Sequence, residues 1–271
     1  MRKSAKVEHE ETRTAMCGKE SLRDRSSGSR RALLLGAIIF SAFAAGCSET
    51  DRGVNPVRQD TLTVAFQDLV SPSTSYAGTS DAILKDGPAT QFRNGNFGAV
   101  PYDTIGGVRL GSSFYERRLI LRMDISSIKN CSKVIRATLA IRVVPPAPDS
   151  LTLGACIVLP AARDAWVEGI GGLGAGVSWT TVDGGVPWTY EGGDFDPAPL
   201  DVRTVRSADS ACVFTLPPQA VLGWIRNPES NHGMIVRSLE RRLAARTTVF
   251  TREHESAGLH PRLEIVYLTG G

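Results

Sequence analysis

Residues 116–144 read ERRLILRMDISSIKNCSKVIRATLAIRVV, and this stretch decides the fold. In its first half, apolar residues recur at every second position from Leu119 onward, with Ile120 as the one exception. This is the period of a strand with one buried face. In its second half, the alternation runs from Ile135 to Val143 and is expected to stop at the two prolines that follow, which cannot donate to a sheet ladder. Two such strands need a second layer to cover their apolar faces, so the sequence predicts a β-sandwich.

The rest of the chain carries more strand-like runs and one helix-like run. The segment PPQAVLGWIRNP predicts a short helix near residues 218–227, because Pro217 and Pro218 suit a first turn and Pro228 ends it. We therefore expect an all-β fold, a two-sheet antiparallel β-sandwich with this one short helix. Further strands are expected at residues 62–67, 82–84, 104–110, 151–159, 213–216, 233–238, 247–253 and 262–268.

The N-terminus has the form of an export signal. Arg30 and Arg31 precede the apolar run Ala32–Ala45, which is too short to span a bilayer comfortably but fits the core of a signal peptide. The sequence AAGC ending at Cys47 resembles a bacterial lipobox, in which the cysteine is diacylated and anchors the mature chain to a membrane. The chain is thus expected to have three parts: a signal peptide of lipoprotein type (1–46), a polar tether (47–60) and a single domain (61–271).

Three details of the N-terminus bear on the export route and on localisation. Either Met1 or Met16 can be the start, and the paired arginines leave both the general and the twin-arginine export routes open. Ser48 rather than aspartate follows the cysteine. By resemblance to the sorting rule of enterobacteria, this favours the outer membrane, so we expect an outer-membrane lipoprotein of the cell envelope.

The net charge of +3 comes from the leader and not from the domain. Residues 1–46 hold nine of the 31 basic and five of the 28 acidic residues, which leaves 22 basic and 23 acidic residues from Cys47 onward. We therefore expect no nucleic-acid partner. Cys131, Cys156 and Cys212 remain in the domain, so at most one disulfide can form, with three possible pairings.

From about residue 80 onward, a series of motifs resembles the DNRLRE-domain family. In order, these are ERRLILRMDIS, KVIRATLAIRV, AWVEG, GVSWTT, GGVPWTYEGGDFDP, VFTLPPQAVLGWIRNPESNHGMIV and VFTREHESAGLHPRLEIVY, and together they cover roughly residues 80–268. The chain departs from the family pattern at Met123, where Phe is usual, and in the insertion-like SLERRLAAR before Phe250. The resemblance implies a jelly-roll-like β-sandwich of secreted and surface proteins. Some family members are reported to be carbohydrate-binding modules for acidic polysaccharides.

Catalytic motifs are lacking in the sequence. The histidines of the domain lie neither in a zinc-binding pattern nor near a G-x-S-x-G elbow, and we expect them on the surface: His232, His254 and His260. Glycoside hydrolysis needs two carboxylates that flank one bond. The available carboxylates are Glu116, Glu168 and Glu253. No spacing places two of them in one cleft, so the sequence predicts no catalytic residue.

Three kinds of residue are candidates for binding. Asp194 and Asp196 lie in a glycine-rich loop and can both turn toward Ca²⁺, although an Asp-x-Asp turn without metal is also common. Arginines at the polar positions of the central strands suit the carboxylates of a polyuronate, or else they pair with acidic neighbours across strands. Loop aromatics can stack on sugar rings or pin the loop, whereas Trp166 and Trp224 are assigned to packing. The candidate ligand-binding residues are Arg118, Arg122, Arg136, Arg142, Arg252, Trp179, Trp188 and Tyr190.

These features together predict a non-catalytic, lipid-anchored envelope protein that binds polysaccharide or mediates adhesion. The first alternative is an enzyme acting on polysaccharide, a hydrolase or a lyase. The second is a structural envelope protein that binds other proteins. The sequence requires no cofactor, and Ca²⁺ is the one metal that it suggests.

Overall fold

The structure, a computed structural model, describes residues 59–147, 149–160, 166–240 and 243–270. They belong to one compact unit, Asn55–Gly271. The expected signal peptide, Cys47 and the tether up to residue 58 lie outside the described residues. No helix within the described part is long and apolar enough to cross a bilayer.

The fold is an antiparallel β-sandwich, as predicted. Eleven strands are joined by hydrogen bonds; nine of them form one continuous path, and β10 and β2 branch from it at β6 and β5. They are β1 (Thr61–Phe66), β2 (Thr79–Lys85), β4 (Tyr102–Leu110), β5 (Ser113–Met123), β6 (Cys131–Ala147), β7 (Ser150–Ile157), β9 (Asp201–Arg206), β10 (Ala211–Leu216), β11 (Met234–Ser238), β12 (Arg246–Phe250) and β13 (Arg262–Thr269). The remaining elements are the strand pair β3 (Gly95–Asn96) and β8 (Gly172–Leu173), the helices α1 (Thr90–Arg93) and α2 (Pro218–Arg226), and the 3-10 turns η1 (Pro228–Ser230) and η2 (Ala257–Leu259).

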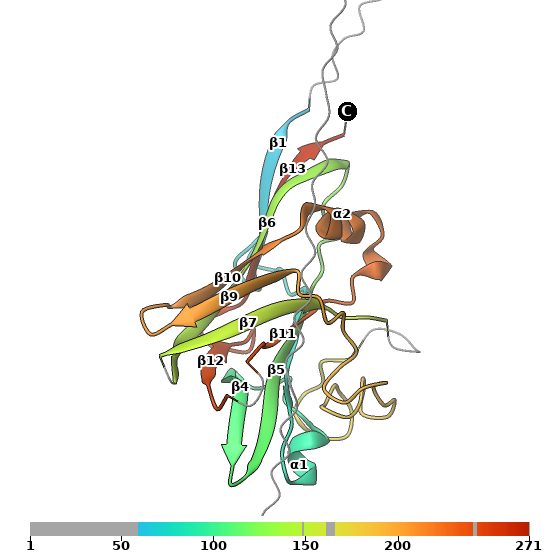
Figure 1. Cartoon of the computed structure of the whole chain (residues 1–271). Helices are drawn as coiled ribbons and strands as arrows, with labels where there is room; N and C mark the ends of the chain where they lie inside the picture. Colours follow the sequence, from blue (N-terminus) through green and yellow to red (C-terminus); the bar gives the residue numbers. More distant parts are fainter. Residues whose placement is uncertain (1–58, 148, 161–165, 241–242, 271) are drawn as a thin grey trace, which may run out of the picture. The chain divides into compact units, whose positions relative to one another are not determined.

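These strands fold into two layers. Strands β1, β13, β6 and β10 make the first sheet. Strands β2, β5, β11, β7 and β9 make the second sheet, and β4 and β12 connect β5 to the end of β6 (Figure 1). The main core lies between the layers and takes Leu139 and Ile265 from the first sheet and Leu121 and Leu153 from the second.

The two central strands do not pair with each other. β5 pairs with β2, β4 and β11, whereas β6 pairs with β10, β12 and β13. Both strands contribute to the main core, as expected of opposite layers. The expectation that β6 ends before Pro145 is wrong, because β6 continues to Ala147. Its ladder to β12 is irregular between Val144 and Ala147, so the two prolines fall where the pairing is interrupted.

A bulge changes the alternation at the start of β6. Val266 pairs with Arg136, while the next residue of β13, Tyr267, pairs with Val134, so Ile135 is an extra residue in the ladder. Val134 is buried, but Ile135 is 45% exposed. The expectation that Ile135 belongs to the core is therefore wrong, whereas Ala137 and the alternating residues after it are buried as predicted.

Helix α2 confirms the short helix expected near residues 218–227. It begins at Pro218 and ends at Arg226. Val221, Leu222 and Trp224 are buried in the main core, so one face of the helix packs onto the sandwich. In Figure 1 the helix lies next to β6.

Candidate functional site

The outer face of the second sheet is covered and not exposed. Ile120 of β5 pairs with Ala82 of β2 and with Ile235 of β11, and all three side chains are fully buried. They lie in a second hydrophobic cluster, which is completed by side chains from the segment between β7 and β9. We call this segment, residues 158–160 and 166–200, the covering segment. Figure 1 shows this segment, in yellow, beside β5. Ile120 departs from the alternation of β5 because a loop, and not the other sheet, buries it.

Tryptophans fix the covering segment to the sheet. Trp166, Trp179 and Trp188 are all buried in the second cluster. The indole N–H of Trp166 donates to the carbonyl of His232 at 2.9 Å, and that of Trp188 donates to the carbonyl of Ser178 at 3.0 Å. Trp188, a candidate for ligand binding, therefore has a packing role, and so does Trp166, as predicted.

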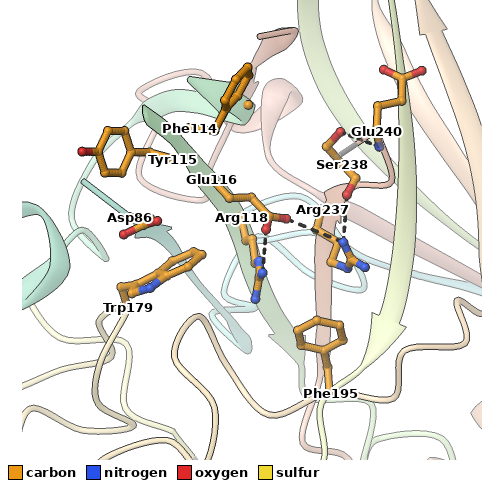
Figure 2. A pocket seen from close by; sticks show the side chains of 11 residues that line it. Asp86, Phe114, Tyr115, Glu116, Arg118, Trp179, Phe195, Arg237, Ser238 and Glu240 are labelled. Carbon is orange, nitrogen blue, oxygen red and sulfur yellow. Dashed lines mark hydrogen bonds and ion pairs between the residues drawn. The ribbon is translucent and has the colours of Figure 1, made fainter. Parts of the chain in front are cut away.

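A cavity of about 320 Å³ opens on this face beside Trp179 (Figure 2). Its apolar side chains are all aromatic and come from β5 and the covering segment: Phe114, Tyr115, Trp179 and Phe195. Its charged side chains are Asp86, Glu116, Arg118, Arg237 and Glu240. Tyr190, another ligand-binding candidate, is 76% exposed and does not line this cavity.

Arg118 stacks between two aromatic rings at the base of the covering segment. Its guanidinium carbon lies 4.7 Å from the ring centroid of Trp179 and 5.1 Å from that of Phe195. Its Nη1 donates to the carbonyl of Gly192 at 2.7 Å, and its Nη2 donates to Oε2 of Glu116 at 2.6 Å. Arg118 therefore ties the covering segment to the sheet through stacking and through hydrogen bonds to a charged donor.

Arg237 completes an ion-paired group with the same carboxylate. Its guanidinium carbon lies 5.2 Å from the Phe195 centroid, and its Nη1 lies 3.7 Å from Oε1 of Glu116. Figure 2 shows the carboxylate of Glu116 between the guanidinium groups of Arg118 and Arg237. The side chains of the two arginines are only 11% and 12% exposed, so both cations are covered by protein.

The sheet register places a second carboxylate beside Glu116. Lys85 pairs with Arg117, and the next residue, Asp86, donates its backbone N–H to the carbonyl of Glu116 at 2.9 Å. Directly opposed residues on one face of an antiparallel pair have Cβ atoms about 4.5–5.5 Å apart. Asp86 and Glu116 are therefore cross-strand neighbours, and both line the cavity.

The surroundings of Asp86 disfavour its charged form. Burial raises the pKa of this carboxyl group, and the nearby carboxylate of Glu191 also raises the pKa. The backbone N–H of Gly87 and the guanidinium of Arg93 oppose both effects, and Arg93 Nε lies 3.6 Å from Asp86 Oδ1. Arg93 also forms an ion pair with Glu191, so its charge is shared between two carboxylates.

The structure does not bring the predicted arginines together. Arg122 is half-buried, with its guanidinium carbon 5.4 Å from the Trp166 ring centroid, and it lies on the outer face of the second sheet. Arg136 and Arg142 are exposed on β6, and Arg136 pairs with Glu264 at 3.3 Å, as the cross-strand alternative predicts. With Arg252 beyond β12, the candidate arginines occupy three places and not one surface.

Arg252 is held in an acidic cluster. Its Nε and Nη2 contact the two carboxylate oxygens of Glu168 at 2.8 Å each, a bidentate pair, and its Nη1 lies 3.4 Å from Oδ2 of Asp68. Asp81 accepts the backbone N–H of Arg252 through Oδ2, but its Oδ1 has no hydrogen-bond partner among the described residues. Burial raises the pKa of both Asp81 and Glu168. Glu168 therefore has a structural partner on each oxygen.

The two calcium candidates accept hydrogen bonds from backbone donors. Asp194 accepts the N–H groups of Thr189 and Tyr190 at 2.9 and 2.8 Å, one on each carboxylate oxygen. Asp196 accepts the N–H of Ala198 at 2.9 Å. Within the described ranges, no three acidic, histidine or cysteine side chains are grouped in a way that could hold a metal ion. Asp194 and Asp196 shape the loop, and their binding of calcium stays a prediction.

One of the three histidines is buried, and the cysteines of the described residues are unpaired. His260 is buried and not on the surface, with its Nε2 2.7 Å from the carbonyl of His254, so the expectation of three surface histidines is wrong for this residue. The cysteines of the described residues are all free thiols, so none of the three possible disulfides forms: Cys131, Cys156 and Cys212.

Comparison with known proteins adds little to this geometry. No family model matches the chain, and no curated protein matches it. One solved structure that matches is a chain of the Israeli acute paralysis virus, described as a full particle heated to 63 degrees. It is 11% identical, and the match covers 97% of this chain and 90% of the viral chain with a TM-score of 0.23. At that TM-score the likeness supports no further argument, and the fold rests on the strand order and register above.

Several residues of the cavity escape sequence reasoning. Asp86, Phe114, Tyr115 and Glu240 are not predicted as site residues, and neither is Phe195, which lies between the calcium candidates Asp194 and Asp196. The register between two strands is the signal that could have found Asp86. When a strand at residues 79–85 pairs with β5 in the observed register, Asp86 lies opposite Glu116. That pairing cannot be read from either strand alone.

Proposed function

We propose that this protein is a non-catalytic saccharide-binding protein and that the cavity beside Trp179 is its binding site. The observation that carries the proposal is the joint presence of four aromatic rings and hydrogen-bonding carboxylates in one cavity. Aromatic faces can pack on the apolar faces of pyranose rings, and carboxylate oxygens can accept hydrogen bonds from sugar hydroxyls. The volume lies at the lower end of the range for small-molecule sites, which suits one or two sugar units.

Binding is favoured over hydrolysis by the state of Glu116. Retaining glycosidases use two carboxyl groups about 5–5.5 Å apart, and the cross-strand neighbours Asp86 and Glu116 are the candidates for such a pair in this cavity. However, Oε2 of Glu116 accepts from Arg118, and its Oε1 is buried without a hydrogen-bond partner. Neither oxygen is open for attack on an anomeric carbon, so we propose no catalytic role for this pair.

The ligand class suggested by the sequence was an acidic polysaccharide. That suggestion depended on free guanidinium groups, and the two that line the cavity are covered and hydrogen-bonded to protein acceptors. The saccharide-binding proposal therefore rests on the aromatic rings and carboxylates and does not require the arginines to contact the ligand.

Attachment to the outer membrane through Cys47 remains part of the proposal, and so does membership of the DNRLRE-domain family. Both rest on the sequence motifs given above. Mass spectrometry of the protein purified from membranes of its native host tests the anchor. A diacylated N-terminal Cys47 is expected, and an unmodified Cys47 would refute it.

A glycan array probed with the full-length chain in detergent, with and without EDTA, tests the binding proposal. Tyr115→Ala removes a half-exposed ring from the cavity and should abolish the binding of any glycan retained by the parent. Tyr190→Ala removes an exposed ring outside the cavity and should leave that binding unchanged. Retention of no glycan, or equal loss in both variants, would contradict the proposal. Capture of an envelope protein in its place would support the structural alternative.

A further inference from the structure

We infer that the cavity beside Trp179 selects saccharides that carry protonated amino groups, such as oligomers of glucosamine, over neutral and acidic ones. This inference rests on the proposed function, because it names the ligand class of the same site. It follows from which charges a ligand meets there.

The charges lining the cavity sum to −1. Three carboxylates, of Asp86, Glu116 and Glu240, face two guanidinium groups, of Arg118 and Arg237. Exposure sharpens this imbalance: the side chains of Asp86 and Glu116 are 25% and 28% exposed, against 11% and 12% for the two arginines. Among the groups that line the cavity, the side chains of Asp86 and Glu116 are therefore more accessible to a ligand than those of Arg118 and Arg237.

The arginines have little capacity left for a ligand. Nη1 of Arg118 donates to Gly192 and its Nη2 to Glu116, while Nη1 of Arg237 donates to the carbonyl of Ser238 at 2.9 Å. The Nε atoms of both arginines are buried and lack hydrogen-bond partners. A uronate carboxylate would have to displace these protein bonds before it could form the bidentate pair that guanidinium groups offer.

Among the cavity carboxylates, Glu116 is ion-paired with Arg118 and Arg237, whereas Asp86 pairs with neither of these arginines. Asp86 and Glu116 are cross-strand neighbours, an arrangement that is unfavourable when both are charged. Arg93, the nearest cation to Asp86, also pairs with Glu191. Burial is the main cause of the raised pKa of Asp86, and the carboxylate of Glu191 adds to it. An ammonium group placed beside Asp86 would add positive charge to the cavity and donate up to three hydrogen bonds.

The aromatic lining favours an amino sugar over a lysine-rich peptide. Every apolar side chain that lines the cavity is an aromatic ring. Phe114 and Tyr115 are half-buried, and the guanidinium carbon of Arg109 lies 5.3 Å from the Phe114 centroid, so Tyr115 keeps the more open ring. Flat rings match the face of a pyranose, whereas the aliphatic stem of lysine needs no flat surface. A pyranose with an ammonium substituent satisfies both the rings and the carboxylates.

Calorimetry with the full-length chain in detergent tests the inference. The probes are a hexamer of glucosamine, its fully N-acetylated counterpart, a galacturonate hexamer and poly-lysine, all at a pH where the amine is protonated. Charge-assisted hydrogen bonds contribute about 1.5–3 kcal/mol, so the glucosamine hexamer should bind about 10–100-fold more tightly than the acetylated one. This preference should shrink as salt is added. The galacturonate hexamer should bind more weakly than either.

Asp86→Asn provides the matched variant. Asparagine retains an oxygen for the N–H of Gly87, the bond that the carboxylate makes at 2.8 Å, and removes one charge. The preference for the glucosamine hexamer over the acetylated one should fall to a few-fold or less, because the variant loses the charge that the protonated amine would meet. Glu229→Gln removes an exposed carboxylate on η1, outside the cavity, and should keep the full preference.

Each outcome separates the inference from the proposed function. If no saccharide binds, the proposed function fails and the inference fails with it. If the acetylated or galacturonate hexamer binds as tightly as the glucosamine hexamer, and Tyr115→Ala abolishes that binding, the site is confirmed and only the inference is overturned. Tighter binding of poly-lysine than of any saccharide would overturn the choice of ligand class. If the parent's preference for the glucosamine hexamer over the acetylated hexamer does not change with salt, the role of charge is refuted, and no variant is needed for this test.

Discussion

Replacing Ile120 by alanine should destabilise the protein far more than the same change at Ile135. Ile120 is fully buried on the outer face of β5 beneath the covering segment, whereas Ile135 is 45% exposed on the bulge of β6. Burial of an isoleucine and the cavity left by its truncation together cost about 2–5 kcal/mol. A half-exposed isoleucine loses much less, on the order of 1 kcal/mol. The alternation in the sequence alone predicts the opposite ranking.

Urea unfolding monitored by tryptophan fluorescence measures both changes. Trp166, Trp179 and Trp188 lie in the second cluster and report on it, while Trp224 lies in the main core. At the lower bound of 2 kcal/mol, Ile120→Ala shifts the folding equilibrium about 30-fold. Equal losses in the two variants, or a larger loss for Ile135→Ala, would show that the loop does not bury the outer face of β5. An early transition confined to the fluorescence of the second cluster would show that this cluster unfolds separately.

Three further outcomes follow from the structure. Gly192 has φ +87°, and an added Cβ would lie 2.5 Å from Nη1 of Arg118, so Gly192→Ala should cost about 1–2 kcal/mol in urea unfolding. Gly223→Ala, at an open helical position, should be neutral or stabilising, and an equal cost at both positions would contradict the packing described. Because burial raises the folded-state pKa of Asp81, the folded protein holds a proton that the unfolded chain releases as pH rises above about 4, and this part of the stability falls with rising pH. The difference in unfolding free energy between Asp81→Asn and the parent should therefore favour the variant more at pH 7 than at pH 4. Urea unfolding that gives the same difference at both pH values would contradict the raised pKa. Cys131, which is half-buried, should react with a thiol reagent before the fully buried Cys156 and before Cys212, whose pKa burial raises to about 12; peptide mapping that finds equal rates would refute this.

Much of the sandwich could be predicted from alternation, because burial on one face leaves a period of two in the sequence. The main strands from β1 to β13 carry this period, and helix α2 is bounded by prolines. The sequence does not predict β9, because only Val205 of its six residues is buried and the strand therefore has no apolar face. Ile135 was misplaced because a bulge shifts the phase of β6 by one residue, and no residue type marks that shift.

The candidate site was only partly predictable, because it depends on contacts between distant segments. Trp179 and Arg118 were recognised as possible binding residues, but their stacking joins β5 to a loop some 60 residues away. The proximity of Asp86 and Glu116 depends on the register between β2 and β5. Ile120 is the one residue whose position in the sequence indicates the covered face. An apolar residue at a position that the alternation assigns to polar residues predicts that the outer face of the strand is also buried, but it does not identify the segment that buries it.

The strand pair β1–β13 has a practical consequence for handling this protein. Thr61, at the start of β1, pairs with Leu268, near the end of β13, so both ends of the folded unit leave from one edge of the first sheet. The cavity opens on the second sheet, which contains neither β1 nor β13. A reporter or solid support can therefore be fused after β13 without blocking access to the cavity.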